Sequence, residues 1–337
     1  MQKETLASPE IFWDTALGYQ RSAAVKAAVH LEIFTAIGNE SKPATTIAQI
    51  AGAAERGIRI LCDSLTVMGL LRKTDDKYSL TDSSATFLDK NSPAYIGSIV
   101  DFLVHPHVMR GFDSLTEAVR QGGTTVTGDG SVDPESPMWV SFARNMMPLQ
   151  FLPAQKAAES IGFDREKPLK VLDIAAGHGI FGITVAQHYP NARIYALDWA
   201  NVLTVAKDNA EKFGVADRFQ TIEGSAFDVD LGLNYDVILV PNFLHHFDVP
   251  TCEAFVKRCA DALAETGKIV TLELVPNDDR VSPPQEAMFS LIMLAGTPGG
   301  DAYTFRELSS MFEKAGLMKN EHILVEPTPQ HVIVSSK

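Results

Sequence analysis

A short glycine-containing loop between two acidic residues is the part of the sequence best suited to chemistry. The apolar stretch at 171–174 contains Asp173 and leads into the loop GHGIFG at 177–182, after which a helical pattern begins. Gly177 and Gly179 can adopt positive φ and let a ligand approach the backbone closely. The N–H groups at the start of a helix have no partners within it. This strand–turn–helix pattern predicts a site for a nucleotide-like ligand.

The loop fits two classes of cofactor. It matches the G-x-G-x-x-G pattern of dinucleotide sites, and Asp198 ends the next predicted strand about 20 residues later, as a ribose-binding acid should. Asp173, however, ends the first strand, where a dinucleotide site normally stays apolar, and its carboxylate suits an ammonium or sulfonium group. Polar features also follow the third and fourth strands, at 223–227 and 242–248. A ligand touched by four strand ends fits S-adenosylmethionine, with NAD in an oxidoreductase as the alternative.

The elements that position these residues begin at Pro168, where strand and helix patterns start to alternate. The predicted strands are 169–174, 193–197, 219–223, 235–240, 268–274, 320–326 and 331–335. Alternation of this kind implies a mostly parallel sheet with helices on both faces, and ligands of such sheets bind at the carboxyl ends of the strands.

The N-terminal part is mostly helical. Residues 10–37 and two segments within 44–68 carry apolar residues at helical spacing, and two short extended segments at 70–81 predict a hairpin. Helix-turn-helix plus a hairpin wing is an architecture of DNA-binding domains. The second helix offers only Arg56 and Arg59 as cations. We therefore expect it to be buried and to pair subunits, with a ligand-sensing DNA-binding regulator as the alternative.

A helical stretch at 95–165 connects the two parts and is interrupted by a predicted loop at 121–137, which is rich in Gly, Ser, Thr and Asp. The expected division is a winged-helix dimerisation domain at 1–100, a helical linker that contributes to the substrate pocket at 101–165, and a cofactor-binding domain at 166–337.

Charge and composition exclude several partners. A formal net charge of −13 over 337 residues repels nucleic acid and anionic membranes. The three cysteines are scattered without a CxxC pair, which favours a reducing compartment. The N-terminus lacks the apolar core of a signal peptide, and no apolar run reaches membrane-spanning length. We expect a cytoplasmic protein.

The ordered set of motifs resembles the plant-type small-molecule O-methyltransferase family, which includes caffeate-type, acetylserotonin-type and bacterial natural-product enzymes. The matching stretches are VLDIAAGHG, ALDWANV, EGSAF, LVPNFLHHFD, GKIVTLELVP and SLIMLAGTPGGDAYTFREL. The resemblance spans nearly the whole chain. It implies an α/β Rossmann-like class I methyltransferase domain with a seven-stranded, mostly parallel sheet, an N-terminal winged-helix dimerisation domain, S-adenosylmethionine as cofactor, and a homodimer.

The resemblance also implies a cofactor site. Four residues would line the methionine part: Asp173, Ala175, Gly177 and Gly179. Four more would hold the nucleoside, Asp198 at the ribose hydroxyls and Trp199, Ser225 and Ala226 around the adenine. The family usually has Asp at the position of Ser225 and often Lys at that of Pro241, so two contacts with the cofactor differ in this chain.

His245 is the expected general base. Methyl transfer from a sulfonium is an in-line displacement that needs the acceptor oxygen about 3 Å from the methyl carbon and removal of its proton. A phenol has a pKa of about 10, so a base helps at neutral pH. The first His of the HHF run matches the catalytic His of the family, and Glu273 could accept its other ring N–H. The family's second Glu is replaced by Ala302, so either Asp301 substitutes or one carboxylate supports the base.

The acceptor pocket is expected to be apolar. Residues that match its lining in the family are Phe142, Met146, Leu149, Ile292 and Met293. Methionine adapts to flat aromatic ligands, so a small aromatic hydroxyl is the expected acceptor, with C- or N-methylation as variants. The cluster around the HHF run lacks the spacing of a metal site, so no metal is expected.

Overall fold

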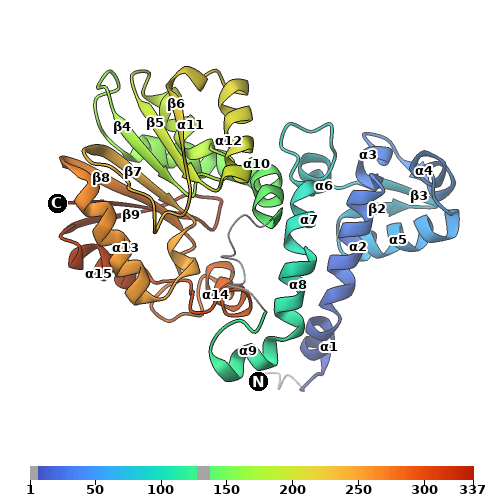
Figure 1. Ribbon diagram of the computed structural model, residues 1–337. Helices are drawn as coiled ribbons and strands as arrows, with labels where there is room; N and C mark the ends of the chain where they lie inside the picture. Colours follow the sequence, from blue (N-terminus) through green and yellow to red (C-terminus); the bar gives the residue numbers. More distant parts are fainter. Residues whose placement is uncertain (1–6, 127–136) are drawn as a thin grey trace, which may run out of the picture. The chain divides into compact units, whose positions relative to one another are not determined.

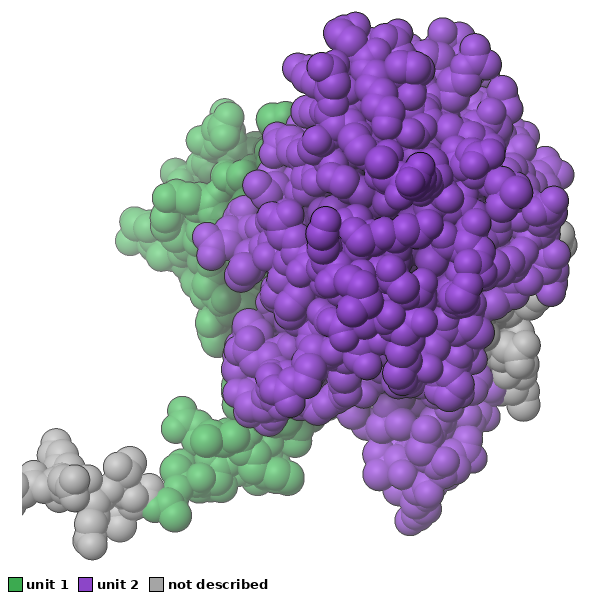
Figure 2. Space-filling view, turned by 90° about the vertical axis from the view of Figure 1, so that its left-hand side faces the viewer, with its two compact units in different colours: residues 1–105 green, residues 106–337 purple. Residues whose placement is uncertain are grey.

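The computed structural model describes residues 7–126 and 137–337 and divides into two compact units, Met1–His105 and Pro106–Lys337 (Figures 1 and 2). Most of the loop predicted at 121–137 lies outside the described residues. Within the described residues, no helix combines the length and the apolar composition that crossing a membrane requires.

The first unit is helical with one small sheet. Its elements are α1 Glu10–Ala16, α2 Gly18–His30, α3 Ile33–Ile37, β1 Lys42–Pro43, α4 Ala44–Ala51, α5 Glu55–Val67, β2 Leu71–Thr74, β3 Lys77–Leu80, α6 Asp82–Phe87, and α7 Val100–Leu103. The predicted hairpin is the antiparallel pair β2–β3, with Asp75 at φ +53° in its turn. The helix expected over 10–37 is divided into three, because Leu17 and the segment Leu31–Glu32 leave helical geometry, Glu32 with φ +52°.

Apolar residues at helical spacing explain the core of this unit. In α5, Ile58, Cys62 and Leu65 are buried at i, i+4 and i+7, which places them on one helix face. They join Phe34 and Tyr78 in a single cluster.

The second unit is built on a seven-stranded sheet (Figure 1). Its strands are β4 Lys170–Ile174, β5 Arg193–Asp198, β6 Phe219–Glu223, β7 Tyr235–Pro241, β8 Leu263–Glu273, β9 Lys319–Leu324 and β10 His331–Ser336. The order is β6-β5-β4-β7-β8-β10-β9, with β10 antiparallel to both of its neighbours and the other pairs parallel. The predicted fold class is confirmed. The predicted start of the fifth strand at 268 is wrong, because β8 begins at Leu263 and pairs there with Tyr235.

Helices cover both faces of the sheet, as a parallel sheet with apolar residues on alternate sides requires. On one face, α10 Pro137–Ser160, α11 Ile180–His188 and α12 Ala200–Lys212 pack against Val171 and its neighbours. On the other face, α13 Val249–Ala262 and α15 Phe305–Lys314 pack against Leu172 and Ile174. The remaining helices are α8 Pro106–Asp113, α9 Leu115–Gln121 and α14 Pro284–Gly296.

Candidate active site

Asp173 is buried at the end of β4, and one of its two carboxylate oxygens accepts no hydrogen bond within the described residues. Its Oδ2 accepts a hydrogen bond from the backbone N–H of Gly182 at 2.9 Å, while Oδ1 has no partner within the described residues. Burial raises the pKa of this carboxyl to about 8. A Cβ at position 182 would stand 2.9 Å from Oδ2, so only glycine lets the α11 backbone approach this closely. A buried acid with a free oxygen suits a ligand that brings a cationic donor.

The loop after Asp173 has unusual backbone geometry. Ala175, Gly177 and Gly179 have φ values of +49°, +58° and +74°. The left-handed region is costly for alanine, and such strain concentrates at functional sites. The N–H of Gly177 donates to Asp198 Oδ2 at 2.8 Å, which joins the loop to the end of β5.

Asp198 is fixed by the backbone around it. Besides Gly177, the N–H of Trp199 donates to its Oδ1 at 2.7 Å, and burial raises its pKa to about 6. Two N–H donors still leave acceptor capacity on the carboxylate for ribose hydroxyls. Trp199 packs against the cluster of Ala143, Val202 and Val205, as Trp139 and Val140 of α10 also do.

The segment after β6 is clamped by Arg258 of α13, a contact that was not predicted. The guanidinium donates to the carbonyl oxygens of Ala226 at 2.8 Å, of Phe227 at 2.5 Å, and of Val229. Ser225 Oγ accepts from the N–H of Phe227 at 3.1 Å. The ends of β4, β5 and β6 therefore bring together the eight residues predicted to bind the cofactor. The free Asp173 oxygen and the acceptor capacity of Asp198 fit a nucleoside that carries a cationic chain, as S-adenosylmethionine does.

His245 and Glu273 form a buried pair at the ends of β7 and β8. Glu273 Oε2 lies 2.5 Å from His245 Nδ1, and its Oε1 accepts from the Leu244 N–H at 2.9 Å. The two residues are 5% and 2% exposed. Because the carboxylate accepts at Nδ1, the ring proton is held there and Nε2 keeps its lone pair, which is the tautomer that a general base needs.

The backbone around His245 explains this position. After β7 the chain turns at Asn242, which has φ +53°, and residues Leu244–His246 form one 3₁₀ turn. Gly300 lies directly against this turn, since a Cβ there would collide with the carbonyl oxygen of His245. The Tyr303 hydroxyl donates to the Phe247 carbonyl at 2.5 Å and closes the turn.

Asp301 does not take the place of a second carboxylate behind His245. Its Oδ2 lies 3.0 Å from Arg280 Nη1, and Arg280 also pairs with Glu307. Ala302, at the position of the family's second Glu, is buried. Of the two possibilities raised from the sequence, the structure favours the one in which a single carboxylate, that of Glu273, contacts His245.

His246, the second histidine of the run, packs against neighbouring aromatic rings. Its ring centroid lies 4.3 Å from that of His245 and 5.6 Å from the Trp139 indole, which meets it edge-on. Burial lowers the pKa of His246 well below its ordinary value, so the ring stays neutral. Within the described residues, no group of three or more His, Cys, Asp or Glu side chains could hold a metal ion.

The residues predicted to line the acceptor pocket lie on two helices: Phe142, Met146 and Leu149 on α10, and Ile292 and Met293 on α14. On α10, Phe142 stacks on His178 of the glycine loop with ring centroids 6.5 Å apart, and Trp139 meets Phe142 edge-on at 5.7 Å. On α14, Phe289 meets the His245 imidazole edge-on at 4.9 Å. The other predicted residues are Met146, half-buried, Met293, buried, and Leu149 and Ile292, 38% and 39% exposed.

Trp139 and Phe289 were not predicted. Each lies one helical turn from a predicted residue, Trp139 three residues before Phe142 and Phe289 four residues before Met293. Helical spacing from the predicted pocket residues was therefore the available signal.

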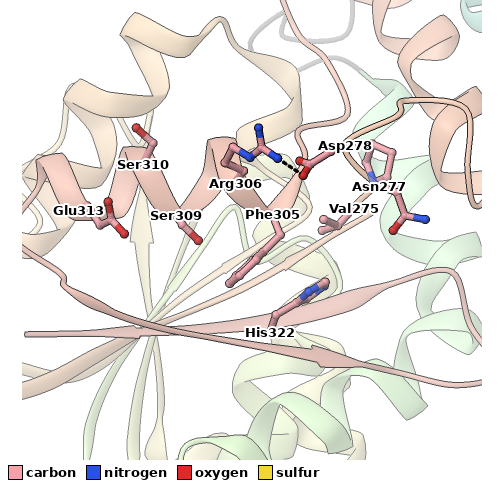
Figure 3. Close-up of a pocket in the computed structure, with 10 residues that line it drawn as sticks. Val275, Asn277, Asp278, Phe305, Arg306, Ser309, Ser310, Glu313 and His322 are labelled. Atoms are coloured by element: carbon pink, nitrogen blue, oxygen red, sulfur yellow. Dashed lines mark hydrogen bonds and ion pairs between the residues drawn. The ribbon is translucent and has the colours of Figure 1, made fainter.

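A separate cavity of about 560 Å³ lies between α15, β9 and the segment after β8 (Figure 3). Among its lining residues, Phe305 and His322 stack on each other, and Arg306 pairs with Asp278. It includes no residue predicted to bind cofactor or acceptor.

Comparisons with known proteins identify the family. Residues 112–318 match an O-methyltransferase domain, and residues 13–90 match an O-methyltransferase dimerisation domain. The chain is 27% identical to 3-hydroxy-5-methyl-1-naphthoate 3-O-methyltransferase of Streptomyces sahachiroi over 91% of this chain and 89% of that protein.

Solved structures give the same result. A crystal structure assigned as an O-methyltransferase of Nostoc punctiforme is 50% identical, with a TM-score of 0.94 over 99% of this chain and 100% of that one. Human N-acetylserotonin methyltransferase in complex with SAM, at 20% identity, shares the fold with a TM-score of 0.83 over 100% of this chain and 99% of that one. The match to the O-methyltransferase domain covers more than half of the chain. The protein therefore belongs to the O-methyltransferase family and is an S-adenosylmethionine-dependent O-methyltransferase of small molecules.

Proposed function

We propose that this enzyme methylates a hydroxyl group on a small aromatic molecule, with His245 as general base and Glu273 as the residue that orients it. The buried contact of 2.5 Å between His245 Nδ1 and Glu273 Oε2 carries the proposal, because it leaves Nε2 able to accept a proton. Three relatives support the aromatic acceptor by name, a naphthoate O-methyltransferase and the acetylserotonin O-methyltransferases of mouse and chicken.

Each residue would do a separate part of the work. S-adenosylmethionine, when bound, supplies a methyl group activated on a sulfonium sulfur. Asp173 would hold its cationic part, and Asp198 its ribose hydroxyls. His245 Nε2 would take the proton of the acceptor hydroxyl while that oxygen attacks the methyl carbon. Glu273 would keep the Nδ1 tautomer and stabilise the imidazolium that forms. The methyl–sulfur bond breaks as the oxygen–methyl bond forms, and one proton leaves through the imidazole.

A homodimer is proposed through the first unit. Its residues 13–90 match a dimerisation domain, and in the single chain α1 exposes Ile11, Phe12 and Trp13 to 81%, 64% and 56%. Large apolar side chains exposed together in this way are typical of a surface that a second subunit covers. Light scattering on the purified chain should give twice the monomer mass, and Trp13→Glu should lower it.

The catalytic roles are tested with His245→Ala and its neighbour variant His246→Ala. With naphthols and S-adenosylmethionine, release of S-adenosylhomocysteine should fall about 10²- to 10⁴-fold in His245→Ala, the range expected for a lost general base. Its affinity for S-adenosylhomocysteine should be unchanged, and His246→Ala should keep most of its activity. An unchanged rate in His245→Ala would remove His245 as base, and a product methylated at carbon or nitrogen would remove the hydroxyl as acceptor.

A further inference from the structure

Glu286 is a buried carboxylate near the base that the proposed mechanism does not use. It lies in the first turn of α14 and is 6% exposed. Within the described residues its one polar contact is His331, whose Nε2 lies 3.7 Å from Glu286 Oε1. That separation is longer than the 2.7–3.2 Å of a hydrogen bond. A largely buried carboxylate without a hydrogen-bond donor from the protein is costly, so such a group takes its partner from solvent or from a ligand.

The helix face of Glu286 is the face that contacts the catalytic pair. Residues 286, 289 and 293 share one side of α14, because they are spaced by three and four positions. Phe289 is the ring that meets the His245 imidazole at 4.9 Å, and Met293 is buried. Glu286 therefore lies one helical turn from Phe289, the residue that contacts His245.

The register of the sheet also places Glu286 near the His245–Glu273 pair, independently of the helix spacing. In the antiparallel pair of β8 and β10, His331 stands directly opposite Glu273. Opposite residues point to the same face, with Cβ atoms about 4.5–5.5 Å apart. Glu286 contacts His331, and Glu273 contacts His245, so the second acid lies beside the first.

His331 cannot satisfy Glu286 at neutral pH. Burial lowers the pKa of His331, so the ring is neutral. Its other nitrogen, Nδ1, is engaged by His322 Nε2 at 2.7 Å, and burial beside His331 lowers the pKa of His322 as well. Two neutral imidazoles share one hydrogen bond, and Glu286 receives at most a long contact from Nε2.

We propose that Glu286 recognises the acceptor. It would bind a hydrogen-bond donor on the substrate while the hydroxyl to be methylated lies at His245, so the substrate class is an aromatic hydroxyl that also carries a second donor, such as another hydroxyl or an amine. This inference rests on the proposed function of His245. It revises the expectation of an apolar acceptor pocket, because one buried acid lies on the same helix face as Phe289 and Met293.

The test uses three matched sets of probes with the full-length enzyme and S-adenosylmethionine: naphthols, dihydroxynaphthalene isomers, and the corresponding methoxynaphthols, which keep the bulk and lose the donor. For at least one isomer, wild type should show kcat/KM about tenfold or more above both the naphthol and the methoxynaphthol. Glu286→Leu should remove that preference and change the rate with the naphthol less than about threefold. Glu286→Gln, which keeps an acceptor oxygen, should keep part of the preference.

Equal kcat/KM values for the three sets in wild type would overturn the proposal. An equal loss of kcat/KM with naphthol and with dihydroxynaphthalene in Glu286→Leu would also overturn it, because a purely structural role gives that result. If Glu286→Leu fails to fold, Glu286→Gln and the wild-type selectivity decide. Failure of the proposed function gives a different result. The wild type would then methylate no hydroxynaphthalene, and the preference for a second donor would be read from equilibrium binding of the same probes to the enzyme loaded with S-adenosylhomocysteine.

Discussion

Binding of S-adenosylmethionine should depend on pH through Asp173. Burial raises the pKa of this carboxyl to about 8 in the free protein, so at pH 7 only about one molecule in ten carries the ionised form. A cationic ligand prefers the ionised form, and its affinity is reduced by the fraction that is protonated. Between pH 7 and pH 9 the ionised fraction rises about tenfold, which corresponds to about 1.4 kcal/mol of binding free energy.

The direction of this pH dependence, and the pH range over which it appears, follow from the raised pKa of Asp173. Affinity should rise with pH and level off above about pH 9, because ionisation is then complete. Asp198, whose pKa is raised to about 6, contributes to the slope mainly below pH 7, so the interval from 7 to 9 isolates Asp173.

Calorimetric titration of S-adenosylmethionine at pH 7, 8 and 9, in two buffers with different ionisation enthalpies, measures both the affinity and the protons released. Asp173→Asn is the matched control, because its amide oxygen can still accept the Gly182 N–H while its charge cannot change. Ionisation of the ligand itself is common to both proteins and cancels in the comparison. The same pH slope in wild type and Asp173→Asn would refute the assignment of Asp173 to the cationic part of the cofactor.

Three further substitutions have defined outcomes. Glu273→Gln should lower kcat at least about tenfold with unchanged binding of S-adenosylhomocysteine, because an amide NH₂ facing Nδ1 forces the proton of His245 onto Nε2; a rate within twofold of wild type in stopped assays would argue against the pair. Arg258→Met should weaken binding of S-adenosylhomocysteine about tenfold in calorimetry and leave kcat at saturating cofactor unchanged, since it frees the carbonyls of Ala226 and Phe227; unaltered affinity would show that the clamp does not bear on the cofactor. Gly182→Ala should lower stability by about 1–3 kcal/mol in thermal unfolding, because its Cβ would stand 2.6 Å from an Ile194 methyl, and an unchanged midpoint would contradict the close packing.

The parallel sheet could be predicted because buried strands are near-continuous apolar runs, and five of the seven predicted strands begin within one residue of the observed ones and end within one residue too. The start of β8 could not be predicted, because the sequence of Leu263–Gly267 is typical of the end of a helix followed by a turn. Only its pairing with Tyr235 makes this segment a strand. Local sequence carries no information about such a partner.

The residues predicted for the site carry their own signal, such as the positive-φ glycines and the acids at strand ends. Trp139 and Phe289 could have been found by helical spacing, whereas Arg258, and Glu286 in its proposed role, act through a neighbouring element. Arg258 reads as an ordinary charge on an amphipathic helix until the carbonyls of 226–229 are seen against it. Glu286 reads as a helix N-terminal acid until the register places His331 beside Glu273. These roles depend on tertiary contacts, which spacing along one chain does not reveal.

The place of β10 between β8 and β9 has a consequence for synthesis. β10 is the last of the seven strands to be made, yet it joins β9 to the rest of the sheet. Until residues 331–336 have left the ribosome, the edge of β8 is uncovered, β9 has no strand to pair with, and the carboxylate of Glu273 lacks the strand beside it. The first unit contains all of its pairing partners within its own 105 residues and can fold much earlier, so the catalytic unit is the part of the nascent chain with the longest exposure to aggregation and to chaperones.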